Sequence, residues 1–358
     1  MKEQMSIEEI AAMLKAQKSN KQDFICGTQE LRMIEKSRLA SGTDSYGEYA
    51  LAIGRKGYFG VTATGHRQIA ERIQIPWTYY KRSMTTAPRL HSDMVNFWHQ
   101  HEPKVRLVRT MYNDARAVLS DKYRPLDNYD LAEAVVPLLM GTGMELKSCA
   151  ITDSKLYLKA VSERIVGEVR VGDVVQAGVC ISNSEIGQGS VKVEPLVFRL
   201  SCKNGMIVTD HSFNARHVGR AYDNGTGGVE QFYRDETRQA DDKALWMKVR
   251  DVVSGTLDQV RFDKLLAGMR EATTREMTAN PVGVTDVTQK MFSLTDDEKG
   301  GVLDALIRGG DLTQFGLSNA VTRHSQDVDD YDRATNLERI GGEIMVLTQP
   351  KWGELVAA

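Results

Sequence analysis

The strongest constraint on the fold is an alternation of apolar and polar residues in the middle third of the chain. The segments Leu156 to Ala160 and Ile165 to Val171 both alternate in this way. A period of two places successive side chains on opposite faces of a strand. The pattern predicts strands with one buried and one solvated face. Between Val191 and Leu200 the apolar positions change parity at Pro195, which predicts a β-bulge there.

Helical spacing dominates the two ends of the chain. Ser6 and Glu9 form a capping-box pattern ahead of one apolar run, Asp127 or Asn128 can cap a second that Pro137 should end or kink, and helical spacing returns after about residue 245. We therefore expect an α+β fold, with a central, mainly antiparallel sheet, flanking helices and a helical C-terminal region. The expected parts are a helical and hairpin region (1–103), a basic α+β core (104–228) and a helical region with an acidic end (229–358).

The net charge of −2 conceals two regions of opposite sign. Residues 104–124 hold six cations and two acids, whereas residues 285–358 hold thirteen acids and seven cations. The near-neutral total excludes indiscriminate polyanion binding, so any such site must be a local patch. The acidic end can screen the basic region, contact a neighbouring subunit or simply be solvated.

The basic region contains the candidate binding residues. Cations along a strand can follow a line of phosphates, and tyrosines among them can stack on unpaired bases. The alternative is a solvated sheet face with the tyrosines in the core. The predicted nucleic-acid-binding residues are Lys104, Arg106, Arg109, Tyr112, Arg116, Lys122, Tyr123, Arg124, Arg199, Lys203, Arg216 and Arg220.

Motifs for other chemistry are weak or missing. There is no G-x-x-x-x-G-K-[ST] loop and no G-x-S-x-G elbow, and His99 and His101 lack an evident third zinc ligand. The acids at 327–332 lack the spacing of a calcium loop. The segment 69–84 fits a DNA-binding helix-turn-helix less well than a plain helical hairpin. We expect no catalytic residues, no metal and no cofactor, and a binding protein rather than an enzyme.

Cysteines and hydropathy indicate the compartment. The four cysteines are far apart in sequence, which favours reduced, mostly buried thiols. No apolar run approaches the length of a membrane span, and no apolar stretch follows the first residues. We expect a cytoplasmic protein without a membrane partner.

Several stretches resemble domain-of-unknown-function family 932, the phage/plasmid-like proteins. They are Arg116 to Asn128, Ser182 to Gly187, Gly189 to Pro195, Cys202 to Met206 and Asn319 to Thr322, followed by Tyr331, Leu337-Glu338 and Gly341-Gly342. The resemblance spans roughly residues 75–352. It implies a gene carried by phages, prophages or plasmids in bacteria, so the expected compartment is the cytoplasm of a bacterial host cell. It brings no established reaction.

Together these observations lead to a functional hypothesis with two alternatives. A basic, Tyr-containing α+β protein of a mobile element is similar in outline to single-strand annealing proteins, so we expect a homo-oligomer that binds single-stranded DNA and promotes ATP-independent annealing or recombination. One alternative is a metal-dependent nuclease using Asp121 and Asp127, which incubation of labelled nucleic acid with magnesium would test. The other is a protein-binding module for a host or phage partner, in host defence or assembly.

Overall fold

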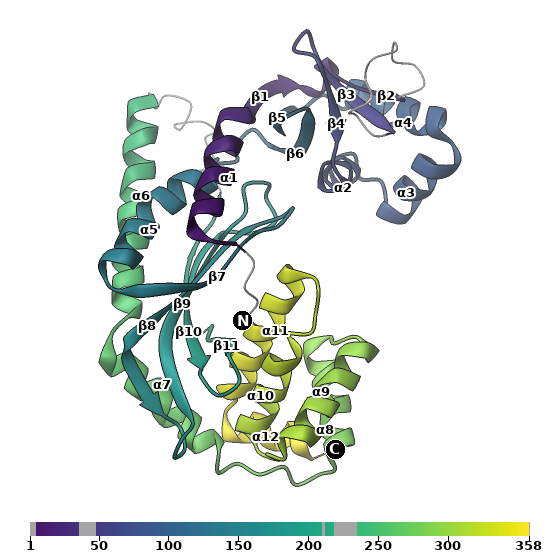
Figure 1. Cartoon of the computed structure of the whole chain (residues 1–358). Helices are drawn as coiled ribbons and strands as arrows, with labels where there is room; N and C mark the ends of the chain where they lie inside the picture. The colour runs from purple at the N-terminus through teal and green to yellow at the C-terminus, as the bar shows by residue number, and fades with distance from the viewer. Residues whose placement is uncertain (1–4, 36–47, 210–211, 218–234, 358) are drawn as a thin grey trace.

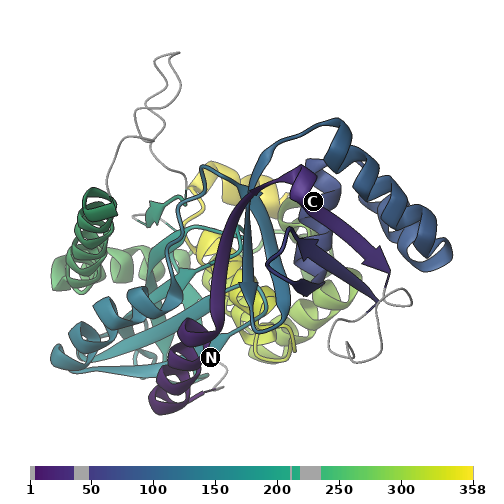
Figure 2. The same cartoon turned by 90° about the horizontal axis from the view of Figure 1, so that it is seen from above.

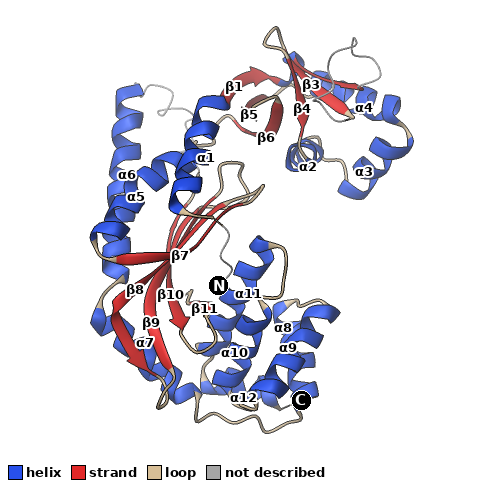
Figure 3. Cartoon of the chain, in the orientation of Figure 1, coloured by secondary structure: helices blue, strands red, loops and turns tan. Residues whose placement is uncertain are grey.

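The computed structural model describes residues 5–35, 48–209, 212–217 and 235–357. These residues form two β-sheets and twelve α-helices, and the part after residue 235 is helical apart from one isolated bridge (Figure 3). The predicted α+β class and the helical C-terminal region are confirmed.

The first sheet has six strands and one helical layer. Its order is β1-β5-β6-β4-β3-β2, antiparallel except for the parallel pair β4–β6. The strands are β1 (Lys21–Gly27), β2 (Leu31–Glu35), β3 (Tyr49–Ile53), β4 (Tyr58–Val61), β5 (Val105–Met111) and β6 (Asp114–Ser120), with a 3-10 turn at Thr28–Glu30. The helices α2 (Ala63–Arg72), α3 (Trp77–Thr86) and α4 (Pro88–His101) bury Ile69, Tyr80 and Val95 against it (Figure 1).

The second sheet is antiparallel and curls between two helical layers. Its order is β11-β10-β9-β8-β7, and β12 also pairs with β10. The strands are β7 (Met144–Ile151), β8 (Leu156–Glu168), β9 (Val174–Asn183), β10 (Val191–Arg199), β11 (Asn204–Ile207) and β12 (Phe213–Ala215). One face packs on α1 (Ile7–Asn20), α5 (Asn128–Gly141), α6 (Asp235–Thr256) and α7 (Gln259–Ala272). The other packs on α10 (Gln314–His324) and α11 (Tyr331–Met345).

The C-terminal helices have a core of their own. α8 (Pro281–Phe292), α9 (Asp296–Gly309) and α12 (Gln349–Val356) join α10 and α11 around buried Leu317, Leu337 and Trp352. Seen from above, α6 and the helices of the first sheet lie on opposite sides of the molecule (Figure 2). The second sheet contacts the C-terminal bundle through α10 and α11.

Two local predictions are confirmed. The Ser6 hydroxyl accepts from the Glu9 backbone N–H at 3.1 Å, and the Glu9 carboxylate accepts from the Ser6 N–H at 2.7 Å, so the capping box begins α1. The hairpin expected within residues 1–103 is formed by Tyr49–Ile53 and Tyr58–Val61. Its turn needs glycine, because Gly57 has a φ of +126°.

The predicted solvated face of the strand at 156–160 is wrong. Tyr157 and Lys159 are buried, at 0% and 1% exposed, because α11 covers that face of the second sheet. The Lys159 ammonium donates to Glu338 at 2.6 Å and to Thr335 at 2.9 Å. The polar residue Lys159 in this alternating pattern therefore forms a buried ion pair and does not contact water.

The predicted bulge at Pro195 is also wrong. β10 pairs with β9 in unbroken register from Lys192↔Ser182 to Arg199↔Val175. The apolar parity changes because both faces of β10 are buried, so neither needs a solvated set of side chains. Pro195 lies between the stretches of β10 that pair with β12 and β11, where its missing N–H breaks no ladder on that edge.

Pro137 lies inside α5, which continues to Gly141, so the helix does not end at the proline. The expected boundary between residues 103 and 104 falls between strands of the first sheet, with β1–β4 before it and β5 and β6 after it.

Candidate nucleic-acid interface

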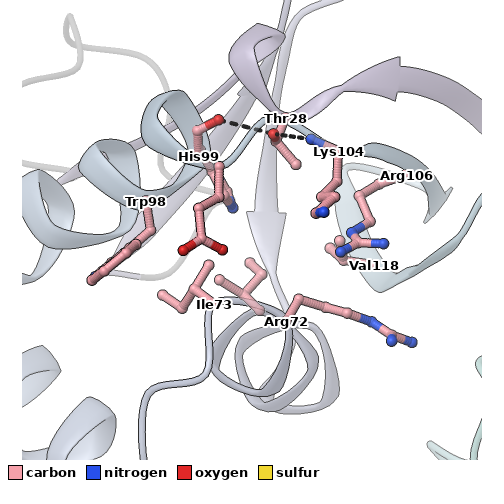
Figure 4. Close-up of a pocket in the computed structure, with 10 residues that line it drawn as sticks. Thr28, Arg72, Ile73, Trp98, His99, Lys104, Arg106 and Val118 are labelled. Atoms are coloured by element: carbon pink, nitrogen blue, oxygen red, sulfur yellow. Dashed lines mark hydrogen bonds between the residues drawn. The ribbon is translucent and has the colours of Figure 1, made fainter.

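A pocket opens where α2, the end of α4 and the start of β5 meet (Figure 4). Ile69, Ile73 and Val118 provide its apolar lining. Arg72, Lys104 and Arg106 supply positive charge, and Trp98, His99 and Glu102 of the α4 end complete the wall with Thr28. The pocket thus combines three cations, an aromatic ring and one carboxylate.

Thr28 fixes the position of Lys104 relative to α4. Its hydroxyl donates to the His99 carbonyl at 2.8 Å and accepts from the Lys104 N–H at 3.1 Å (Figure 4). The Thr28 N–H donates to the Lys104 carbonyl at 2.8 Å. Because Thr28 is buried, these bonds are shielded from water and hold the helix end and the strand start together.

The positive charge of the pocket is not neutralised by ion pairs. In the described part of the chain, none of Arg72, Lys104 and Arg106 forms a salt bridge with a carboxylate. Burial, and then the charge of Arg72, lower the pKa of Arg106, with Asp121 opposing. Among the described residues, the Arg106 Nε is also a buried donor without a hydrogen-bond partner. Neighbouring cations without ion-pair partners and an unsatisfied donor are features of an anion-binding site.

His99 is a buried neutral imidazole in the same wall. Burial lowers the pKa of His99, a hydrogen bond with the Leu31 backbone acts in the opposite direction, and the charge of Arg106 adds to the lowering, which brings the pKa to about 4. Its Nδ1 is buried and has no hydrogen-bond partner among the described residues. The pocket wall therefore contains two buried polar atoms, Arg106 Nε and His99 Nδ1, that the described residues leave unsatisfied.

Arg109 lies in the interior of the protein rather than at a surface. Its side chain is 2% exposed and donates to Asp23 at 2.9 Å, to Asp127 at 2.7 Å and to the Glu185 carbonyl at 2.9 Å. Arg109 thus joins the first sheet to the start of α5 and to the loop after β9. Its donors are used within the protein, so the structure does not offer it to a phosphate.

Arg116 belongs to the same internal network through Glu185. The Glu185 carboxylate accepts from Arg116 at 2.9 Å, from Lys21 and from the Asn128 backbone N–H at 2.7 Å. The last contact caps α5. Asp127, the residue before the helix, does not cap it with its side chain, because that carboxylate accepts from Arg109. The buried network of Lys21, Asp23, Arg109, Arg116, Asp127 and Glu185 is called the Glu185 network below.

Three more predicted residues have internal partners. Arg124 pairs with Asp242 of α6, and Arg199 pairs with Asp173. The Tyr123 ring stacks on His217 at a centroid distance of 5.1 Å, and its hydroxyl donates to the Ser184 carbonyl at 3.1 Å. For Tyr123 the structure therefore agrees with the alternative expectation, in which the tyrosines of the basic region pack inside the protein.

The remaining predicted residues are not brought together. Lys122 is exposed. It lies near the pocket, because it is two residues after Ser120, which pairs with Arg106 between β6 and β5. Tyr112 is 55% exposed at the opposite end of β5, roughly 25 Å along the strand from Lys104. Lys203 and Arg216 are exposed on the second sheet. Arg220 lies outside the described residues.

Sequence reasoning missed Arg72 and Trp98 as site residues. Both lie on helices, where they belong to no charged run and no alternating pattern. The available signal was regional, because residues 63–101 contain five Lys or Arg and two acids. The exposed Arg67 guanidinium also lies 5.1 Å over the Trp77 ring in this region. Cations and aromatics thus extend from the pocket over α2 and α3.

The described ranges hold neither a metal-binding cluster nor a membrane-spanning helix. No three His, Cys, Asp or Glu side chains gather there in a way that could hold a metal ion. No helix described there is long and apolar enough to cross a membrane. Cys26, Cys149 and Cys180 are buried free thiols, and Cys202 is an exposed one.

These features define a two-sheet α+β protein with a cationic surface pocket and a buried ionic network between its sheets. The chain belongs to the DUF932 family, a domain of unknown function, which it matches over residues 115–340. Neither the curated proteins nor the solved structures give a match. Of the pocket residues only Val118 lies within the family match, whereas Arg116, Asp127 and Glu185 of the network all do.

Proposed function

We propose that this chain binds single-stranded nucleic acid, with DNA favoured, through the pocket of Arg72, Lys104 and Arg106. The observation that carries the proposal is the gathering of three cations without ion-pair partners in one pocket of the described chain. A polyanion would supply the missing counter-charge, and the release of its condensed ions would favour binding.

The apolar and aromatic part of the pocket favours an unpaired strand over a duplex. Trp98 is partly exposed, and Ile69, Ile73 and Val118 line the pocket beside it. An unpaired base has a free π-face that can lie on such groups, whereas a duplex hides its bases in the stack. The resemblance to phage and plasmid proteins favours DNA, which such elements process.

Salt dependence tests the proposal quantitatively. If the three cations each contact one phosphate, log K for a labelled 20-nucleotide strand should fall with log salt at a slope of about −2. The combined Arg72→Ala and Lys104→Ala substitutions should weaken binding to every sequence and make the slope shallower by about 1.4. Fluorescence polarisation at several salt concentrations measures both quantities.

A charge-matched control separates the pocket from general electrostatics. Lys290→Ala plus Arg308→Ala removes two exposed cations from the C-terminal bundle. This variant should bind as the parent protein does. Equal losses in the two double variants, or no binding by the parent protein at low salt, would refute the proposal.

A further inference from the structure

The pocket has an acceptor side as well as a cationic side. Glu102 contributes a carboxylate, and in the described part of the chain it pairs with no cation although Lys104 and Arg106 line the same pocket. Glu102 ends α4, and its N–H donates to the Trp98 carbonyl at 3.0 Å, so the carboxylate and the Trp98 ring come from one helical turn. A pocket for phosphate alone has no use for a carboxylate, which repels it.

His99 adds a second acceptor. The hydrogen bond with the Leu31 backbone raises the imidazole pKa, as donation to a carbonyl does, while Nδ1 has no partner. The ring is neutral because burial lowers its pKa to about 4. A neutral ring carries one proton, and when this proton is on Nε2, the Nδ1 atom has a free lone pair and is an acceptor. The residue is 3% exposed and lines the pocket. Its free acceptor is best satisfied by an N–H or O–H of a ligand.

Building on the proposed function, we propose that one unpaired base lies over the mouth of this pocket beside a phosphate, and that the site prefers a base that carries an amino group. The cations contact the phosphate, the Trp98 ring lies against the base, and Glu102 accepts from the amino group. Cytosine, adenine and guanine carry such a group. Thymine instead presents the O4 carbonyl, which the carboxylate of Glu102 repels.

The two pyrimidines provide the sharpest comparison, because cytosine and thymine have the same ring size. The parent protein should bind a 20-nucleotide oligo-dC about tenfold more tightly than oligo-dT, as expected for one specific base contact. Glu102→Gln should remove this preference, because its amide can also donate to the thymine carbonyl. Glu133→Gln, at an exposed position of α5, is the matched control and should keep the preference.

The outcomes distinguish this inference from the proposed function. A preference for oligo-dC that is lost in Glu102→Gln and kept in Glu133→Gln supports the inference. Equal binding of the two strands by the parent protein, or a preference that survives Glu102→Gln, overturns the inference and leaves single-strand binding intact. Failure to bind either strand at low salt overturns both.

Discussion

At the scale of single residues, Glu185 holds two parts of the chain together. Its carboxylate is 1% exposed and accepts from Lys21 of β1, Arg116 of β6 and the Asn128 N–H of α5. A buried acceptor with three donors is costly to alter, because each unsatisfied partner remains buried without water. Glu185 therefore links the first sheet to α5, which packs on the second sheet.

Glu185→Gln should lower the free energy of unfolding by about 3 kcal/mol or more, the cost of breaking a buried ion pair. The amide keeps one acceptor but places an N–H group beside cations. Urea unfolding followed by circular dichroism measures the change. The control is Glu145→Gln, whose side chain is 49% exposed and pairs with Lys147, and it should change stability by less than about 1 kcal/mol. Equal stabilities of the two variants would contradict this role of Glu185.

The same residue shows what the sequence could not provide at this scale. The basic run of residues 104–124 was visible, but not which of its cations had internal partners. Asp23 and Glu185 lie 86 and 76 positions from Arg109, so no local pattern connects them. Lys104 and Arg106 remain available because no carboxylate of the described residues forms an ion pair with them.

At the scale of elements, two buried ion pairs fix α11 on the second sheet. Lys159 of β8 pairs with Glu338 at 2.6 Å, each side chain 2% exposed, and Arg339 pairs with Glu194 of β10, also at 2.6 Å. The two pairs come from adjacent positions of the helix and reach different strands. The two pairs therefore fix both the position of α11 along the sheet and its rotation about the helix axis.

A double-mutant cycle tests the Lys159–Glu338 pair. Lys159→Met alone should destabilise the protein by about 3–5 kcal/mol, because it leaves Glu338 buried and unpaired. Adding Glu338→Leu should recover much of this loss, since a buried pair can be replaced by apolar side chains at small cost. Urea unfolding of the four proteins gives the coupling energy. Strictly additive losses would show that the two side chains do not interact.

The predicted and missed elements follow from the same physics. The capping box of α1, the β3–β4 hairpin and the helical C-terminal region were predictable, because each depends on neighbours in the sequence. The facing of β8 and β10 was not, because α11 covers them from more than 130 positions away. Alternation of apolar and polar residues therefore indicates a solvated strand face only where no distant element covers that face.

At the scale of the whole molecule, buried imidazoles are spread through the interior. Burial lowers the pKa of His66 to about 3, with His91 contributing, and lowers the pKa values of His91, His99 and His217 to about 4. His66 bonds the Tyr80 hydroxyl at 3.0 Å and His91 bonds Ser83 at 2.9 Å, both in the core of the first sheet. His217 bonds Asn183 at 2.9 Å beside the second sheet. Each ring is held neutral in the folded protein.

These four rings should make the protein unstable in mild acid. The unfolded chain binds a proton at each ring near pH 6.5 but the folded chain only near pH 3–4, so stability is complete above 6.5 and falls below it. At pH 5 each ring costs roughly 2 kcal/mol, which for four rings approaches the whole stability of an ordinary domain.

Urea unfolding at pH 7, 6 and 5 measures this loss, and single substitutions assign it. His91→Gln should reduce the difference between pH 7 and pH 5 by roughly 2 kcal/mol, even if it lowers stability at both values, because it removes one ring that must stay neutral. His101→Gln, at an exposed ring stacked on Phe97, should leave the difference unchanged. Stability that is flat from pH 7 to pH 5 would mean that the buried rings accept protons within the folded protein. The pH profile therefore reports whether the core of the first sheet, which supports the pocket, stays closed to water.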